Sequence, residues 1–402
     1  MDAAVKEGGT ITFWSWVPEM EAAVEAYERA YPSVDVDFEV VGLDVETQLR
    51  TALEAGTGLP DVTQLQQTSV ASFVLSDSLL DLTPYGAADL EDQFVPSAWD
   101  SVTIGDGIFG TPQDIGPVAS MYRTDIFDEA GIEFPTTWEE FAQAAQIIKD
   151  KTGSYITNFS ALENAPLAQH ASKDRMFSWD GGENLTLAAD NPDVLKFAEY
   201  WQDLIDRDLV STDPILTDPW YQGMASGKYA SWIGAAWGPL FLKSAAANTA
   251  GLWAATDAPQ WDPAAPSYPN SGGSAISALA TTKQPLLAAH FVQWLNADPE
   301  AVGVLNTEVS LFPATVGLLN DEAWLQKPDE FFAGQSINKV FGKAALDMEP
   351  PVGVPFSTYY TTSQNDTIGA ALANGTSLPE AYKAWQRELV AYAQEQGFTV
   401  NE

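Results

Sequence analysis

The order of strands and helices in the first 66 residues most constrains the fold. Residues 10–14 are rich in β-formers and predict a buried strand, and a helix with Pro18 in its first turn follows. Residues 34–40 alternate apolar and acidic side chains, which predicts a strand with one wet face. A helix over residues 46–55 and a strand from residues 59–62 complete the pattern. This alternation predicts right-handed crossovers and a mainly parallel sheet.

The rest of the chain continues in the same α/β style. A capping box at residues 137–140 predicts a helix to about residue 151, and a second one at 377–380 opens a helix to about 396. Further helices are expected from Asn191 and over residues 285–297. The Pro-, Gly- and Ser-rich residues 255–273 are expected to form an irregular connection.

Length and charge set broad limits on function. With 402 residues, the chain is long enough for two or three lobes. Its 18 Lys and Arg against 56 Asp and Glu give a net charge of −38, which disfavours nucleic-acid and anionic-membrane partners. The acidity is equally compatible with a role in solubility alone. No apolar run is long enough to span a membrane. Met1 leads directly into polar sequence, so we expect either a cytoplasmic protein or one whose leader is not part of this sequence.

Catalytic and metal-binding motifs are missing. The absence of cysteine excludes disulfides, thiolate zinc sites and cysteine nucleophiles. No phosphate-binding loop, nucleophile elbow or zinc-protease motif occurs. Of the two histidines, His290 lies in an apolar helix and is expected to pack, whereas His170 is expected at the surface or in a loop. We therefore expect no metal, no cofactor and no serine triad.

Aromatic residues are abundant, with 14 Trp, 13 Tyr and 19 Phe. Indole faces stack on sugar rings, and an aromatic contact contributes about 0.5–1.5 kcal/mol beyond area burial. Trp14, Ser15 and Trp16 end the first strand, where ligands bind in open α/β sheets. Glu19 in the next helix is a further candidate, or it only favours the helix N-terminus. A given Trp is otherwise a core residue.

Three later positions extend this set. Gln66 follows the third strand, and Asp114 lies in residues 110–117, which we expect to form an irregular polar turn. Asp114 either accepts hydrogen bonds from hydroxyl groups or caps the turn. Trp237 follows a short strand among small residues that leave its face free, whereas Trp232 is expected in the core.

Ordered landmarks over nearly the whole chain resemble the bacterial extracellular solute-binding proteins of the carbohydrate type, the superfamily of the maltodextrin-binding protein. The matching segments are residues 9–16, 59–62, 122–127, 135–141, 226–230 with Trp237, and 272–295. Arg123-Thr124 and Tyr229-Ala230 depart from the family pattern, and residues 313–355 match no pattern.

The resemblance implies a two-lobed periplasmic-binding-protein-like α/β fold, with each lobe a mainly parallel sheet flanked by helices and joined by hinge strands. The expected lobes are residues 1–113 plus 272–330, and 114–271 plus 331–402. The implied function is capture of an oligosaccharide by hinge closure, as a non-enzymatic monomer that delivers it to the permease subunits of an ABC transporter. The implied location is the periplasm or, through a lipid anchor, the outer face of the membrane. The implied contacts are Trp14, Ser15, Trp16, Gln66, Asp114, Trp237, Gly273 and Ser274, with Asn158, Glu163, Tyr359 and Tyr360 as further candidates.

Two other functions stay open. A glycoside hydrolase needs two opposed carboxylates, for which Glu19, Asp114 and Glu163 are candidates. The other is a binding protein for a polyamine, a peptide or a metal ion, and polyamine sites also use aromatic and acidic side chains. A cationic ligand would bind more weakly at high ionic strength, whereas a neutral sugar would not.

Overall fold

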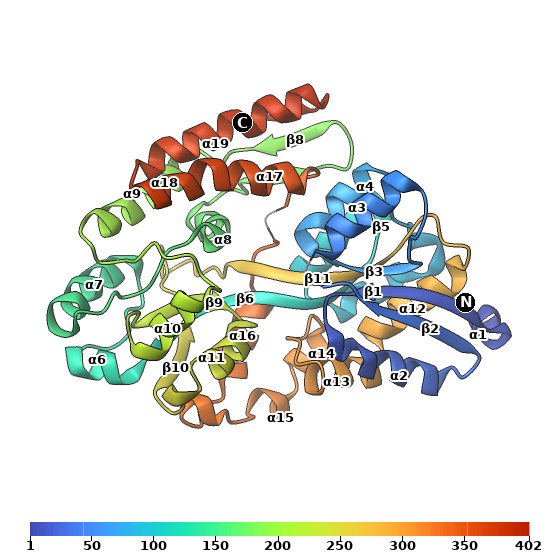
Figure 1. Ribbon diagram of the computed structural model, residues 1–402, viewed down its shortest axis with the longest axis horizontal. Helices are drawn as coiled ribbons and strands as arrows, with labels where there is room; N and C mark the ends of the chain where they lie inside the picture. Colours follow the sequence, from blue (N-terminus) through green and yellow to red (C-terminus); the bar gives the residue numbers. More distant parts are fainter. Residues whose placement is uncertain (43, 352, 402) are drawn as a thin grey trace.

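The computed structural model describes residues 1–42, 44–351 and 353–401. The molecule has two halves, with blue elements on one side and green elements on the other, bridged by long strands (Figure 1). Both halves mix helices with β-structure, as expected for an α/β fold. Among the described residues, none of the helices has the length and apolar character needed to cross a membrane.

A seven-stranded sheet runs through both halves, in the order β10-β6-β11-β3-β1-β2, with β9 paired to β6. β1 pairs in parallel with β2 and with β3, which confirms the parallel pairing predicted for the first 66 residues. β11 pairs antiparallel with β3 and with β6, and β6 pairs antiparallel with β9 and β10. The sheet as a whole is therefore mixed. Its parallel pairs join β1 to β2 and to β3, and its other strands pair antiparallel.

The first lobe is defined here by the elements around the core residues Phe13 and Phe291. Its strands are β1 (Gly9–Ser15), β2 (Val34–Val40), β3 (Val62–Gln66), β4 (Thr103–Ile104) and β5 (Gly107–Ile108). Its helices are α1 (Asp2–Glu7), α2 (Glu21–Ala30), α3 (Val45–Ala55), α4 (Val70–Leu75), α5 (Pro96–Val102), α12 (Pro285–Ala297), α13 (Pro299–Thr307), α14 (Val316–Leu319) and α15 (Glu322–Leu325).

The second lobe is defined by the elements around Trp201 and Trp232. Its strands are β7 (Phe177–Trp179), β8 (Asn184–Leu187), β9 (Ser231–Ala235), β10 (Trp253–Asp257) and β12 (Thr399–Asn401). Its helices are α6 (Thr124–Ala130), α7 (Trp138–Thr152), α8 (Ala161–Ala171), α9 (Pro192–Asp206), α10 (Asp218–Ser226), α11 (Gly238–Ala245), α16 (Ile337–Leu346), α17 (Ser357–Gln364), α18 (Ala370–Asn374) and α19 (Leu378–Glu395), with a π-helix at Asn365–Gly369.

Two strands connect the lobes. β6 (Thr111–Arg123) and β11 (Asn270–Ala278) lie side by side across the molecule (Figure 1). The expectation of an irregular turn at residues 110–117 is therefore wrong, because most of this segment is extended strand. The expectation of an irregular connection over residues 255–273 is wrong at both of its ends, which belong to β10 and β11. Pro and Gly residues are tolerated in these strands because the pairing of β6 with β11 shifts register twice.

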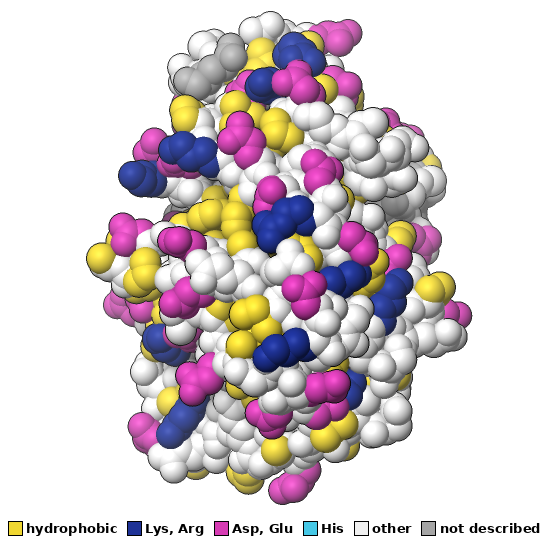
Figure 2. All heavy atoms as spheres, turned by 90° about the vertical axis from the view of Figure 1, so that its left-hand side faces the viewer, with side chains coloured by type: hydrophobic (Ala, Val, Ile, Leu, Met, Phe, Trp, Pro, Cys, Tyr) yellow, Lys and Arg dark blue, Asp and Glu magenta, His cyan; other side chains and the backbone are white. Residues whose placement is uncertain are grey.

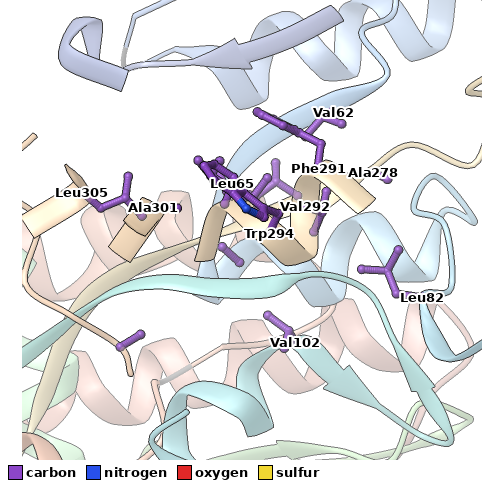
Figure 3. Close-up of a cluster of buried hydrophobic side chains, with 14 of the residues drawn as sticks. Val62, Leu65, Leu82, Val102, Ala278, Phe291, Val292, Trp294, Ala301 and Leu305 are labelled. Carbon is purple, nitrogen blue, oxygen red and sulfur yellow. The ribbon is translucent and has the colours of Figure 1, made fainter. Parts of the chain in front are cut away.

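The first-lobe core shows why its helices and strands form. α12 is apolar on most of its surface, and Phe291, Val292 and Trp294 pack with Val62 and Leu65 of β3 (Figure 3). Phe291 also meets Tyr27 of α2 edge to face, with ring centroids 4.9 Å apart. His290 packs here, as expected, and its Nδ1 lies 2.9 Å from the Tyr27 hydroxyl.

The second lobe has a core dominated by aromatic rings. Trp201 stacks on Phe159 with ring centroids 4.2 Å apart and meets Trp138 edge to face at 5.5 Å. The predicted capping box of α7 is present, because Thr137 accepts from the Glu140 amide while Glu140 caps Thr137 in return. Trp232 is fully buried, as expected. The two lobes thus have separate cores, and the predicted lobe boundaries stay a prediction.

Charged side chains are scattered over the outside of the second lobe. Figure 2 shows the face at the left-hand end of Figure 1, where acidic side chains are spread among fewer basic ones. Several of the basic residues form surface ion pairs, such as Lys149 with Asp208 and Arg207 with Asp203. Exposed pairs of this kind contribute about 0–1 kcal/mol each, so the acidic excess acts on solubility and association rather than on the fold.

Candidate functional site

A network of buried polar side chains lies where the first-lobe strands end against the crossing strands. The Ser15 hydroxyl donates to Gln64 Oε1 at 2.6 Å. Gln64 Nε2 donates to Gln113 Oε1 at 2.7 Å and to Ser274 Oγ at 3.1 Å. All four residues are at least 96% buried, so each hydrogen bond replaces one that water would otherwise make. The network links β1 and β3 to β6 and β11 and fixes their relative positions.

Asp114 lies at the edge of this network, on β6. Its Oδ1 accepts from the Ser274 amide at 2.8 Å and from the Ser274 hydroxyl. Its own carbonyl accepts from Gln67 Nε2 at 3.0 Å. Burial raises the pKa of the Asp114 carboxyl, and the hydrogen bonds from Ser274 oppose this rise. Among the described residues these bonds use Oδ1, and none of the hydrogen bonds found there involves Oδ2. Asp114 bridges two strands instead of capping a turn.

The two Trp residues at the end of β1 have different surroundings. Trp14 is half-buried and packs against the first-lobe core. Trp16 is also half-buried, but among the described residues it joins neither the core clusters nor any aromatic pair. The Trp16 amide donates to Gln64 Oε1 at 3.3 Å, which holds its backbone to the buried network. Trp16 is therefore the better candidate for a stacking surface.

Trp237 is the corresponding candidate in the second lobe. It follows β9, precedes α11 and is half-buried where the two second-lobe core clusters meet. Its rings meet Trp232 and Phe241 edge to face, with centroids 5.6 and 5.7 Å apart. Its indole Nε1 donates to the Ser271 carbonyl of β11 at 2.9 Å. The Trp237 side chain is thus anchored to a strand that connects the lobes.

The crossing strands approach each other closely at glycines. Gly272 and Gly273 have φ of +95° and +123°, a region that L side chains rarely adopt. A Cβ on Gly273 would lie 2.8 Å from the Asp114 carbonyl oxygen, and one on Gly116 would lie 2.3 Å from the Ser271 carbonyl oxygen. Glycine is needed at both positions, and the predicted role of Gly273 as a backbone contact stays a prediction.

Helix α17 of the second lobe lies next to the first lobe. The Ser357 amide donates to Ser72 Oγ at 2.8 Å, and Arg50 Nη2 donates to Ser357 Oγ at 3.3 Å. Tyr359 stacks on Tyr392 with centroids 3.8 Å apart, which covers one face of its ring. Tyr360 packs against Trp385 instead, at 5.0 Å.

The remaining predicted contacts are placed differently. Asn158 is 97% buried, and both ends of its amide are used, because Oδ1 accepts from Trp220 Nε1 at 2.8 Å and Nδ2 donates to the Asp213 carbonyl at 3.3 Å. This geometry does not support a ligand contact for Asn158. The hydroxyl of Tyr360 is likewise buried, and burial raises its pKa. The Glu163 side chain lies outside the described residues.

Glu19 and Gln66 are both exposed, and their ligand contacts stay predictions. Ser15 and Ser274 are at least 99% buried, so they hold the strands in place through Gln64.

The expectation for His170 is wrong, because His170 is buried in α8, where its Nδ1 lies 2.8 Å from Ser267 Oγ. Burial lowers the His170 pKa to about 4, so this histidine is neutral at pH 7.

Sequence reasoning missed the glutamines that build the site. Gln64 and Gln113 are buried in the polar network, and Gln67 is 97% buried with Nε2 bonded to Asp114 and Ser274. Gln64 and Gln66 lie two apart on β3 and so point to the same face, and strand alternation therefore gave no signal that separates them. Gln64 is buried because it lies inside the strand, whereas Gln66 lies at its exposed end.

A separate hollow of about 520 Å³ opens on the second lobe, lined by Trp138, Tyr200 and Trp261 with polar residues at its rim. None of its lining residues belongs to the buried network or to the strand ends. The strand-end region is the stronger candidate, because it combines a half-buried Trp from each lobe with the Asp114 carboxyl at the edge of the buried polar network.

Comparison with known proteins identifies the family of the chain. Residues 14–302 match the model of a protein family described as bacterial extracellular solute-binding protein. A lactose-binding protein of Rhizobium radiobacter is 27% identical, over 94% of this chain and 91% of that protein. An arabinooligosaccharide-binding protein of Halalkalibacterium halodurans is 22% identical, over 92% and 85% of the two chains.

Solved structures extend the likeness to the fold. The ABC-transporter-associated binding protein of B. animalis subsp. lactis Bl-04, in complex with β-1,6-galactobiose, is 28% identical with a TM-score of 0.84. The match covers 98% of this chain and 99% of that one. On the family match, which spans the first-strand tryptophans and Trp237, the chain belongs to the bacterial extracellular solute-binding proteins.

Proposed function

We propose that this protein is the oligosaccharide-binding component of an ABC importer and that it binds its ligand between the two lobes. The observation that carries the proposal is the placement of Trp16 and Trp237, one from each lobe, beside the network that ends in Asp114. Flat indole faces stack on the C–H face of a sugar ring, and Asp114 Oδ2 accepts from a hydroxyl.

The buried network explains how such a site stays rigid. Ser15, Gln64, Gln113 and Ser274 fix the β1 end and the Asp114 carboxyl to the same four strands. A ligand then meets groups that are already in position, so little conformational entropy is lost on binding. The same rigidity discriminates among sugars, because an unpaired buried polar group costs about 1–3 kcal/mol.

Within the oligosaccharides, we propose a short β-galactoside as the ligand. The named ligands of the two relatives with 27% and 28% identity are lactose and β-1,6-galactobiose. Both are disaccharides with a β-linked galactose at the non-reducing end. The axial hydroxyl of galactose leaves one ring face rich in C–H groups, which suits a Trp surface.

Ligand contact with both lobes favours a closed arrangement, and the membrane permease recognises that arrangement. A ligand shifts such an equilibrium only through its different affinities for the open and closed forms, and contacts from both lobes provide this difference. We place the protein on the outer side of the cytoplasmic membrane, in agreement with its family, held there by a lipid anchor or enclosed in a periplasm.

A thermal-shift screen tests the proposal, followed by calorimetric titration of the hits. The panel contains lactose, β-1,6-galactobiose, maltose, arabinobiose and spermidine. A ligand at 100 times its Kd stabilises the native state by about 3 kcal/mol, and this raises the melting temperature measurably. We expect stabilisation by a galactoside and an affinity that salt does not change. Stabilisation by spermidine alone, lost at high salt, would refute the sugar proposal, and sugar cleavage during incubation would identify a hydrolase.

A further inference from the structure

The contact between Trp237 and β11 lies at the point where the strand pairing changes. Asn270 pairs with Pro117, Gly273 pairs with Ile115, and the register shifts between these two pairs. Ser271 and Gly272 lie inside this irregular segment, and Gly272 and Gly273 have positive φ. A register shift at glycines lets a strand bend with little steric cost, so this is the segment of β11 where a bend meets the least resistance.

Two groups lie close to the Ser271 carbonyl oxygen. Trp237 Nε1 donates to it at 2.9 Å, and Gly116 of β6 approaches it so closely that a Cβ would lie 2.3 Å away. A Cβ on Gly272 would also lie 3.4 Å from Trp237 Nε1. The indole of Trp237 therefore contacts the bend itself, and its hydrogen bond depends on the geometry of the bend.

We propose that Trp237 is a positioning residue for lobe closure, whose indole N–H holds the β11 bend at Ser271 in the lobe arrangement described here. The inference rests on the proposed function, because the same indole is the proposed stacking surface of the second lobe. A ligand that orients the Trp237 ring then acts on the bend through one hydrogen bond. Binding and lobe movement are coupled in a single side chain.

The expected size of the effect follows from that hydrogen bond. A bond of this kind shifts an equilibrium between two arrangements by about 2- to 10-fold when only one of them contains it. Trp237→Phe removes the N–H and retains an aromatic face. Replacement of Trp237 by β-(3-benzothienyl)alanine retains both rings and puts sulfur in place of N–H. Both variants lack the bond to Ser271, and only the first also loses stacking area.

Trp16→Phe is the matched control. It removes an indole N–H from the other proposed stacking surface, and no hydrogen bond joins the Trp16 indole to the crossing strands among the described residues. The chain has no cysteine, so Asp92→Cys and Lys196→Cys provide one exposed label site on each lobe without competing thiols. Single-molecule energy transfer between the labels then reports the populations of lobe arrangements without ligand.

We expect both Trp237 variants to change the population ratio of the ligand-free protein by 2- to 10-fold, and Trp16→Phe to leave it unchanged. We expect lower galactoside affinity in Trp237→Phe and in Trp16→Phe. An unchanged population ratio in both Trp237 variants, with native circular dichroism and melting temperature, would overturn the inference. Because the ratio is measured without ligand, failure of the wild-type protein to bind any sugar refutes the proposed function and leaves this test intact.

Discussion

The carboxyl of Glu349 gives a prediction about stability and pH. Glu349 follows α16, and its amide donates to the Tyr268 carbonyl at 2.9 Å. Burial raises the pKa of its side chain from 4.5 to about 7, although hydrogen bonds from Gln169 and Ser267 and the nearby Arg175 oppose the rise. The other titratable neighbour, His170, shares Ser267 as a partner and is neutral at pH 7.

A carboxyl whose pKa is higher in the folded than in the unfolded protein destabilises the fold once it ionises. Stability is therefore lost as pH rises from about 4.5 through about 7. At about 1.4 kcal/mol per pH unit, the full change corresponds to about 3 kcal/mol, and partial solvent access reduces it to about 1–3 kcal/mol. Glu349→Gln mimics the neutral acid and removes this loss.

The assay is urea unfolding of the wild type, Glu349→Gln and Glu388→Gln at pH 5 and pH 8. Glu388 is an exposed carboxyl and serves as the control. We expect the free energy of unfolding of Glu349→Gln, relative to the wild type, to increase by about 1–3 kcal/mol between the two pH values. Glu388→Gln should show no such change. A wild-type-like pH dependence in Glu349→Gln would refute the reasoning.

Five further substitutions, with Gln66→Leu as a control, test the site and its support. Trp16→Ala and Trp237→Ala should each weaken galactoside binding by about 10-fold or more with the fold intact, measured by calorimetry; unchanged affinity would place the ligand elsewhere. Asp114→Asn should weaken it by about 10-fold through loss of a charged acceptor, and an equal Kd would exclude a direct contact. Gln64→Leu should destabilise the protein by about 2–4 kcal/mol in urea because it removes the acceptor of the Ser15 O–H and the donor to Gln113 and Ser274, whereas the exposed Gln66→Leu should change stability by less than about 0.5 kcal/mol. Gly273→Ala should cost about 1–3 kcal/mol, since φ is +123° there, and a wild-type melting temperature would contradict this.

Local pattern was sufficient to predict the parts of the fold in which propensity and burial agree. The alternation over residues 34–40 gave β2, and the Thr137 capping box gave α7, because both signals lie within a few residues. The crossing strand β6 was not predicted. Its Pro and Gly residues favour a turn locally, and only pairing with β11, about 160 residues later in the chain, makes the segment extended.

The sequence led to a candidate site but not to the packing of its side chains. Strand ends identified Trp14, Trp16 and Trp237, because ligands bind beyond strand ends in such sheets. Which indole faces outward depends on long-range packing, as the contrast between Trp14 and Trp16 shows. The predicted ligand contact of Asn158 has the same weakness, because the Trp220 indole that donates to its amide oxygen lies 62 residues away in the sequence.

The arrangement of the two cores has a consequence for how the chain is made. The first-lobe core combines residues 5–115 with residues 268–348, and a second-lobe core combines residues 118–258 with residues 354–393. Neither core is complete until most of the polypeptide has emerged from the ribosome or crossed the membrane. Until then, residues 5–115 keep apolar side chains exposed. Exposed apolar surface of this kind is bound by chaperones and favours aggregation. In a protein that is exported, such a delay keeps the chain unfolded, and able to pass through a translocation channel, until transport is nearly finished.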